Sequence, residues 1–107
     1  MLKSPITTDD LLPNPHPGAG FREDLFEAGD ISIEETAAAT GLSVNALNGF
    51  LDGTHRVDAD FDLRFGRYFG FSKGFFLRLQ NAYDLEEVQR AAGAEIDRIQ
   101  PRVEHAA

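Results

Sequence analysis

The chain has 107 residues, of which 42% are hydrophobic and 26% charged, the size and composition of one globular domain. It has no cysteine and no apolar run near the roughly 18 residues that span a bilayer, which excludes disulfides, thiolate chemistry, Cys-ligated zinc and a membrane span. The formal net charge is −8, and such a surface repels nucleic acid except at a local cationic patch but favours a basic protein partner.

The first 16 residues carry three of the five prolines and are predicted to form an extended arm. They lack the apolar core of a signal peptide, so we expect a cytoplasmic protein. A helix is predicted over residues 17–28, because Pro17 suits a first helical turn and Gly29 a helix end. The side chains that this helix would turn inward are Phe21, Leu25 and Phe26.

Two short helices are predicted next. Ser32 and Glu35 form an S-x-x-E capping box, so the second helix begins there and ends near Gly41. Ser43 is a good N-cap for a third helix, which Gly53 closes.

Further helices follow without any sustained strand alternation. Asp58 is predicted to cap a fourth helix that ends at Gly70, and Ser72 a fifth, "KGFFLRLQNAY". Asp84 with Glu87 resembles a capping box for a sixth helix, which would end before Pro101. The prediction is an all-α fold of five or six short helices. It divides into an arm (1–16), a helical domain (17–85) and a C-terminal helix with its tail (86–107).

The segment "IEETAAATGLSVNALNGFLDG" (33–53) predicts a helix-turn-helix. Ala37 is small where two crossing helices would approach each other, and Gly41 tolerates the positive φ of the corner. Leu47 and Phe50 lie one turn apart, where they would seat the second helix against the first. An ordinary helical hairpin can share this pattern, so the motif is the favoured interpretation of two.

In a helix-turn-helix the first residues of the second helix face the base edges of DNA. Asparagine can pair with adenine, valine can contact a thymine methyl, and a cation can contact a phosphate. The alternative is that these side chains are solvated surface. The predicted DNA-binding residues are Ser43, Val44, Asn45, Asn48, Thr54, His55 and Arg56.

Several motifs occur together in an informative order: "PHPG" (15–18), "TGLS" (40–43), "LDGTHRVDAD" (51–60) and "RYFGFSKGFFLRLQNAYDL" (67–85). In this order they resemble the HigA-type antitoxins, a branch of the Xre (lambda-repressor-like) helix-turn-helix proteins. The resemblance implies a compact lambda-repressor-like domain in a type II antitoxin. Such a protein binds and silences a small basic RelE-like ribonuclease toxin and represses its own operon as a dimer.

The sequence departs from this family pattern at five positions. The family usually has glutamine at the position of Ile33. A cation is frequent at the position of Ala38, and arginine or another polar residue is common at that of Val44. Without a phosphate anchor, binding to every DNA sequence weakens. Asp62 stands where the family usually buries alanine, and Phe76 where it has tryptophan.

Three functions are therefore compatible with the sequence: an autorepressing antitoxin, a stand-alone Xre-type regulator, and a helix-turn-helix scaffold that binds protein but has lost DNA binding.

Part of the fifth predicted helix is expected to form a dimer face. The residues of this face are Phe76, Leu79, Gln80 and Tyr83.

We expect neither an enzyme nor a bound cofactor or metal. The sequence has no nucleophile motif or phosphate loop. After "DADFD" (58–62), Leu63 and Phe69 stand where a calcium loop needs glycine and glutamate. Asp58 and Asp60 are better explained by helix capping and first-turn charge.

Overall fold

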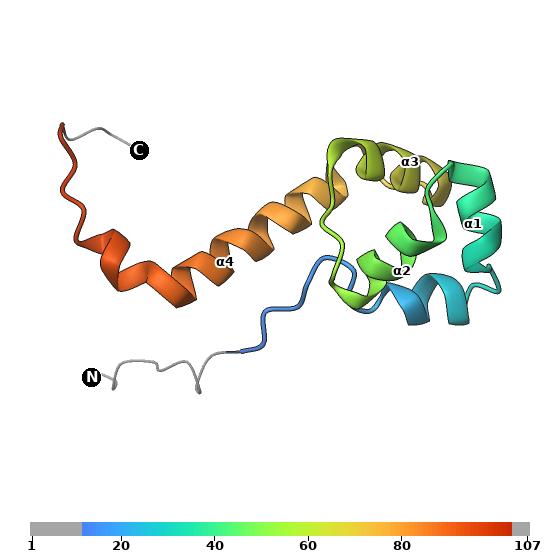
Figure 1. Ribbon diagram of the computed structural model, residues 1–107, viewed down its shortest axis with the longest axis horizontal. Coiled ribbons are helices and arrows are strands. Elements are labelled where there is room, and N and C mark those ends of the chain that lie inside the picture. Colours follow the sequence, from blue (N-terminus) through green and yellow to red (C-terminus); the bar gives the residue numbers. More distant parts are fainter. Residues whose placement is uncertain (1–11, 104–107) are drawn as a thin grey trace.

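The computed structural model describes residues 12–103, and every regular element in that range is a helix (Figure 1). In chain order the elements are the π-helix η2 (Arg22–Glu27), α1 (Ile33–Thr40), α2 (Val44–Asp52), α3 (Ala59–Phe69) and α4 (Phe75–Asp97). The predicted all-α class is confirmed. Most of the predicted arm, residues 1–11, lies outside the described range. None of the described helices has the length and apolarity to cross a membrane.

The three central helices begin and end at the predicted residues. In α1, α2 and α3 the N-cap side chain accepts a hydrogen bond from the backbone N–H three residues further on. These caps are Ser32, Ser43 and Asp58. The helices end at Gly41, Gly53 and Gly70, each with φ between 80° and 85° in the left-handed region. Local sequence signals therefore set these boundaries.

The α-helix predicted over residues 17–28 is wrong in its start and in its type. Residues 17–20 form turns, because the ring Nδ1 and the carbonyl oxygen of His16 accept hydrogen bonds from the N–H groups of Gly18 (3.1 Å) and Ala19 (3.0 Å). Gly20 then adopts φ 85°, which interrupts a right-handed helix. The chain continues as η2, where the Ala28 N–H reaches the carbonyl five residues back, that of Glu23, at 2.8 Å.

The fifth and sixth predicted helices are one helix, α4. Its N-cap is Gly74, which has no side chain, and Ser72 does not cap it. The buried carboxylate of Asp62 on α3 supplies the missing acceptors: it accepts from the N–H groups of Gly74 (2.6 Å), Phe76 (2.8 Å) and Leu77 (3.2 Å). A residue distant in sequence has thus replaced a local cap.

The core is built mainly from phenylalanine. The ring of Phe50 on α2 lies 4.8 Å from that of Phe61 and 5.2 Å from that of Phe65, both on α3. It also lies 5.7 Å from the ring of Phe76 on α4 and 6.0 Å from that of Phe21, which precedes η2. One side chain of α2 therefore packs against α3, α4 and the segment before η2, and this helps to fix the orientation of the helix.

The "PHPG" motif packs the chain against the C-terminal end of α2. A Cβ atom on the buried Gly18 would lie 1.9 Å from the Phe50 carbonyl oxygen, and one on Gly53 would lie 2.6 Å from the His16 ring. Both glycines are therefore needed for the close approach of two segments, and Gly53 also for its positive φ.

Replacing Gly18 with alanine should destabilise the fold by about 2–3 kcal/mol, because the new methyl group meets a backbone carbonyl that cannot move without α2. Gly66→Ala is the matched control. Its Cβ would lie 3.5 Å from the nearest atom, the carbonyl oxygen of Phe71, and alanine favours the interior of α3. Thermal or urea unfolding should give the two variants opposite signs. Equal stabilities would contradict the close approach at Gly18.

Replacing Asp62 with alanine should cost about 2–3 kcal/mol of folding stability, because three N–H groups of the first turn of α4 lose their acceptor. Amide hydrogen exchange at Phe76 and Leu77 should accelerate. The matched control is Asp60→Ala on the same helix, which removes only an exposed ion pair with Arg64. If both variants lose the same stability, Asp62 does not hold α4.

Candidate nucleic-acid interface

The predicted corner between α1 and α2 is present. Gly41 has φ 80°, and its N–H donates to the Ala37 carbonyl at 2.9 Å. The Thr40 hydroxyl donates to the Thr36 carbonyl (2.6 Å) and accepts from the Leu42 N–H (3.1 Å), which orders the turn. Two short helices joined by this ordered corner form a helix-turn-helix.

The inner face of the motif is the predicted one. Leu47 and Phe50 are fully buried, and Ala37 packs against the core that they form. The first turn of α2 therefore has its exposed residues on the outer face of the helix.

The residues predicted to contact bases lie on that outer face. Val44 and Asn45 are exposed and Asn48 is half-buried. Within residues 12–103, neither asparagine amide is used in a side-chain hydrogen bond, so both can bind a ligand. The Ser43 hydroxyl accepts from the Ala46 N–H at 2.9 Å and keeps its proton to donate. The geometry permits base contacts, and these assignments remain predictions.

The loop after α2 folds back onto that helix. The N–H groups of Thr54 (2.8 Å) and His55 (3.1 Å) both donate to the Gly49 carbonyl. A Cβ atom on Gly49 would lie 2.8 Å from the Cβ of His55, so glycine permits this return. Thr54, His55 and Arg56 are all exposed, beside the C-terminal end of α2.

Arg56, the predicted phosphate contact, is in an ion pair. Its Nη1 and Nη2 donate to the two carboxylate oxygens of Asp84 on α4, at 3.1 and 2.6 Å. These hydrogen bonds are the main reason that the pKa of Asp84 lies below its usual value, so the carboxylate is charged at neutral pH. Asp84 does not begin a sixth helix, because it lies within α4. Its side chain binds Arg56 in the loop after α2.

Gln80 also connects α4 to the loop after α2. Its Nε2 donates to Asp84 at 3.0 Å, and its Oε1 accepts from the Val57 N–H at 2.9 Å. The motif "LQNAYDL" thus has a structural explanation: its glutamine and aspartate, one turn apart, hold the loop that follows α2.

The departures from the family pattern have different structural consequences. Ile33 packs against the core, so the start of α1 offers an apolar side chain followed by the exposed acids Glu34 and Glu35. Ala38 is exposed and uncharged. The start of α1 therefore has no phosphate anchor.

The predicted dimer face is divided by the fold. Phe76 is 0% exposed and Gln80 5% exposed, both inside this chain's own core. Leu79 and Tyr83 are half-buried, and the Tyr83 carbonyl accepts a hydrogen bond from Asn14 at 3.2 Å. A second copy could reach only these last two side chains without rearrangement of the core.

A further cation lies at the corner of the motif, where spacing along the sequence does not reveal it because tertiary structure brings it there. Arg64 on α3 donates from Nη1 to the Thr40 carbonyl at 2.8 Å, at the end of α1, and from Nε to Asp60 at 2.8 Å. The position of Arg56 in the sequence suggested that it was the only cation near α2. Arg64 shows that it is not.

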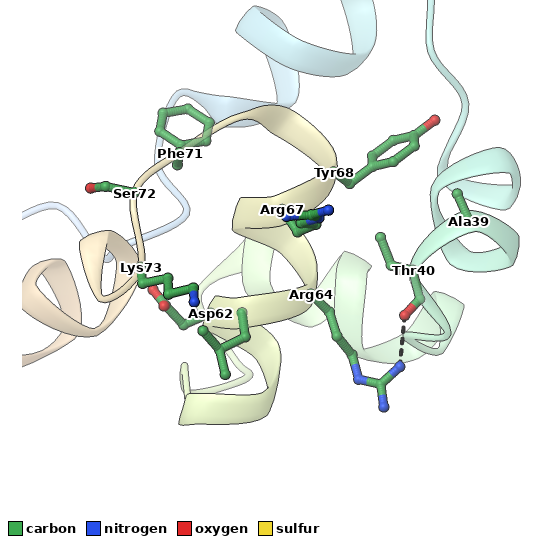
Figure 2. Close-up of a pocket in the computed structure, with 10 residues that line it drawn as sticks. Ala39, Thr40, Asp62, Arg64, Arg67, Tyr68, Phe71, Ser72 and Lys73 are labelled. Carbon is green, nitrogen blue, oxygen red and sulfur yellow. Dashed lines mark hydrogen bonds between the residues drawn. The ribbon is translucent and has the colours of Figure 1, made fainter.

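Arg64 also borders a shallow groove of about 680 Å³ between α3 and the end of α1 (Figure 2). Tyr68 and Arg64 point toward α1, and Lys73 lies on the other side of α3. Arg64, Arg67 and Lys73 all line this groove, and the spacing of the two arginines along α3 was the one signal for these cations in the sequence.

The fold is shared with known antitoxins. An antitoxin HigA of Pseudomonas aeruginosa, solved with the higBA promoter, is 32% identical, with a TM-score of 0.74 over 85% of this chain and 100% of that one. The chain belongs to the HigA family of antitoxins. No protein-family model matches it.

Two further proteins are similar to this chain. A HigA-family addiction module antidote protein of Coxiella burnetii has a TM-score of 0.75 and 28% identity, over 84% of this chain and 99% of its own. Virulence-associated protein I of Dichelobacter nodosus is 32% identical over 79 residues, which are 74% of this chain and 73% of the relative. The resemblance predicted from the motifs is confirmed.

Proposed function

We propose that this chain is the antitoxin of a type II toxin–antitoxin system, which neutralises a small basic toxin and represses its own operon. The observation that carries the proposal is the ordered helix-turn-helix, with the first turn of α2 exposed, in a fold shared with a HigA solved on its promoter. The relatives are antitoxins and DNA-binding regulators, which supports a binding role in the cytoplasm and not a catalytic one.

In this proposal α2 enters the major groove. Asn45 and Asn48 read base edges, while Thr54, His55 and Arg56 lie beside the backbone. The cationic contribution is small, since Arg56 and Arg64 are both in ion pairs and α1 begins with two glutamates. We therefore expect a modest salt dependence and a large contribution from base contacts.

The charge of the chain supports a basic toxin, of the RelE-like ribonuclease class that the family resemblance implies. The segment before His55 carries nine acidic and two basic residues, and the described acids include the exposed Glu23, Asp24, Glu34 and Glu35. Complementary charge speeds association and selects a cationic partner.

A helix-turn-helix that binds protein alone is the second candidate, and the first turn of α1 favours it. Ile33, which stands where the family has its anchoring glutamine, packs against the core, and two glutamates follow it. Both functions share toxin binding and differ only in DNA binding.

Asn45→Ala should weaken binding to the duplex upstream of the chain's own gene by about 1–3 kcal/mol, because a paired base edge loses its partner. A shuffled duplex should lose little, since its binding depends on phosphates. The matched control is Asn81→Ala, an exposed asparagine on α4. Fluorescence anisotropy measures both. Neutralisation of the toxin encoded by the adjacent gene should be unchanged.

Three results of this experiment separate the candidates. A wild-type chain that neutralises the toxin but binds neither duplex supports the second candidate. Binding to the upstream duplex without any toxin neighbour indicates a stand-alone regulator. Equal operator affinities for Asn45→Ala and Asn81→Ala contradict the placement of the reading face on α2.

We also propose that the chain forms a two-fold dimer through the distal half of α4, which projects away from the other helices (Figure 1). The α4 residues that pack against the core end at Leu79 and the buried Gln80. Beyond them Leu85, Val88 and Ile96 are exposed, and at 100° per residue they lie within an arc of about 80°. A two-fold axis there would present two α2 helices, which must lie roughly 34 Å apart to bind one face of DNA.

Val88→Glu should convert the dimer to a monomer, because it places a charge in the apolar stripe. Ala94→Glu introduces the same side chain on the opposite face of α4 and serves as the control. Sedimentation velocity reports the mass, and circular dichroism confirms that helix content is kept. A wild-type monomer, or a dimer that survives Val88→Glu, excludes this interface.

A further inference from the structure

The DNA-contacting loop has one cation of its own, and α4 already neutralises it. Arg56 is the only lysine or arginine between Ile33 and Val57. Its side chain is 70% exposed, yet both terminal nitrogens are bound by Asp84, which is 33% exposed. Two parallel charge-assisted hydrogen bonds are the strongest way in which a carboxylate holds a guanidinium.

Asp84 is itself held in place, so it does not follow Arg56 toward a ligand. Gln80 donates to Asp84 and accepts from the Val57 N–H, and it is buried. The side chain of Arg56 and the backbone of the next residue are therefore both fixed to one turn of α4.

A phosphate that approaches Arg56 has two ways to bind, and both are costly. It can displace Asp84, which breaks two hydrogen bonds and leaves a fixed carboxylate nearby. It can instead share the guanidinium, which places two anions a few ångströms apart. In either arrangement the contact is weaker than that of a free arginine.

We propose that Asp84 is an internal competitor of DNA phosphate: it retains Arg56 against α4 and thereby lowers the affinity of the loop after α2 for DNA. This inference rests on the proposed DNA binding. A partner that displaces the turn containing Gln80 and Asp84 would release Arg56 and Val57 together, so α4 connects partner binding to the DNA contact.

The test compares Asp84→Asn with Glu86→Gln. Both variants change the net charge from −8 to −7, and both remove the carboxylate partner of an arginine, Arg56 in one and Arg90 in the other. Only the first arginine is next to α2. The readout is fluorescence anisotropy on the duplex upstream of the gene and on a shuffled duplex, over a series of salt concentrations.

Asp84→Asn should bind both duplexes about two- to fivefold tighter, because an exposed ion pair no longer has to be broken. Its plot of log affinity against log salt should be steeper by up to about 0.9, the contribution of one additional phosphate contact. Glu86→Gln should match the wild type. Adding Arg56→Ala to Asp84→Asn should abolish the gain, which shows that the gain acts through Arg56.

Affinity for Asp84→Asn that equals or falls below that of Glu86→Gln overturns the inference, because Asp84 would then position Arg56 or have no effect on it. The wild type separates this result from failure of the proposed function: if it binds the upstream duplex, only the inference falls, and if no variant binds any duplex, both fall.

If Asp84→Asn loses helix content, the Arg56→Lys variant tests instead whether Asp84 lowers the affinity for DNA by retaining Arg56. Lysine keeps the charge but cannot make the paired hydrogen bonds, so it should bind DNA at least as tightly as the wild type. Weaker binding by this variant overturns the inference.

Discussion

The packing of Phe50 against four other rings is the constraint on which the arrangement of this molecule depends. Its contacts reach α3, α4 and the segment before η2, so α2 is fixed from its inner face. The buried Gly18 lets another segment pack directly on the Phe50 backbone. Because orientation is set from inside, residues on the outer face of α2 can differ between relatives without moving the helix. The same scaffold can therefore present different reading surfaces.

Polar side chains, by contrast, determine where α4 lies. Asp62 holds its first turn from α3, and Gln80 with Asp84 holds the loop after α2 one and two turns further along. These attachments all lie in the proximal half of the helix. The distal half carries an exposed apolar stripe, which makes it the part of the chain best suited to a second copy. Helix α4 thus joins the loop after α2, the proposed site of DNA contact, to the proposed dimer surface.

The distribution of charge determines the balance between the two proposed partners. Three arginines near α2, namely Arg22, Arg56 and Arg64, are each paired with an aspartate, and α1 begins with glutamates. Such a surface attracts a basic protein directly, whereas DNA gains little from phosphate contacts. In the proposed function, operator recognition therefore depends more on base contacts, which are sensitive to sequence, than on general attraction to the backbone.

The sequence alone determined the features whose physical cause is local. Ser32, Ser43 and Asp58 cap their helices from three residues away, and the left-handed glycines end them, so α1, α2, α3 and the corner at Gly41 were predicted correctly. The motifs from "PHPG" to "LQNAYDL" indicated the family. Tertiary structure decided what depends on distant partners. Asp62 replaced the predicted cap at Ser72, Asp84 bound Arg56 and Gln80 and did not begin a helix, and Arg64 reached the corner from α3. A polar side chain binds the partner that the fold places beside it, and spacing along the chain does not reveal that partner.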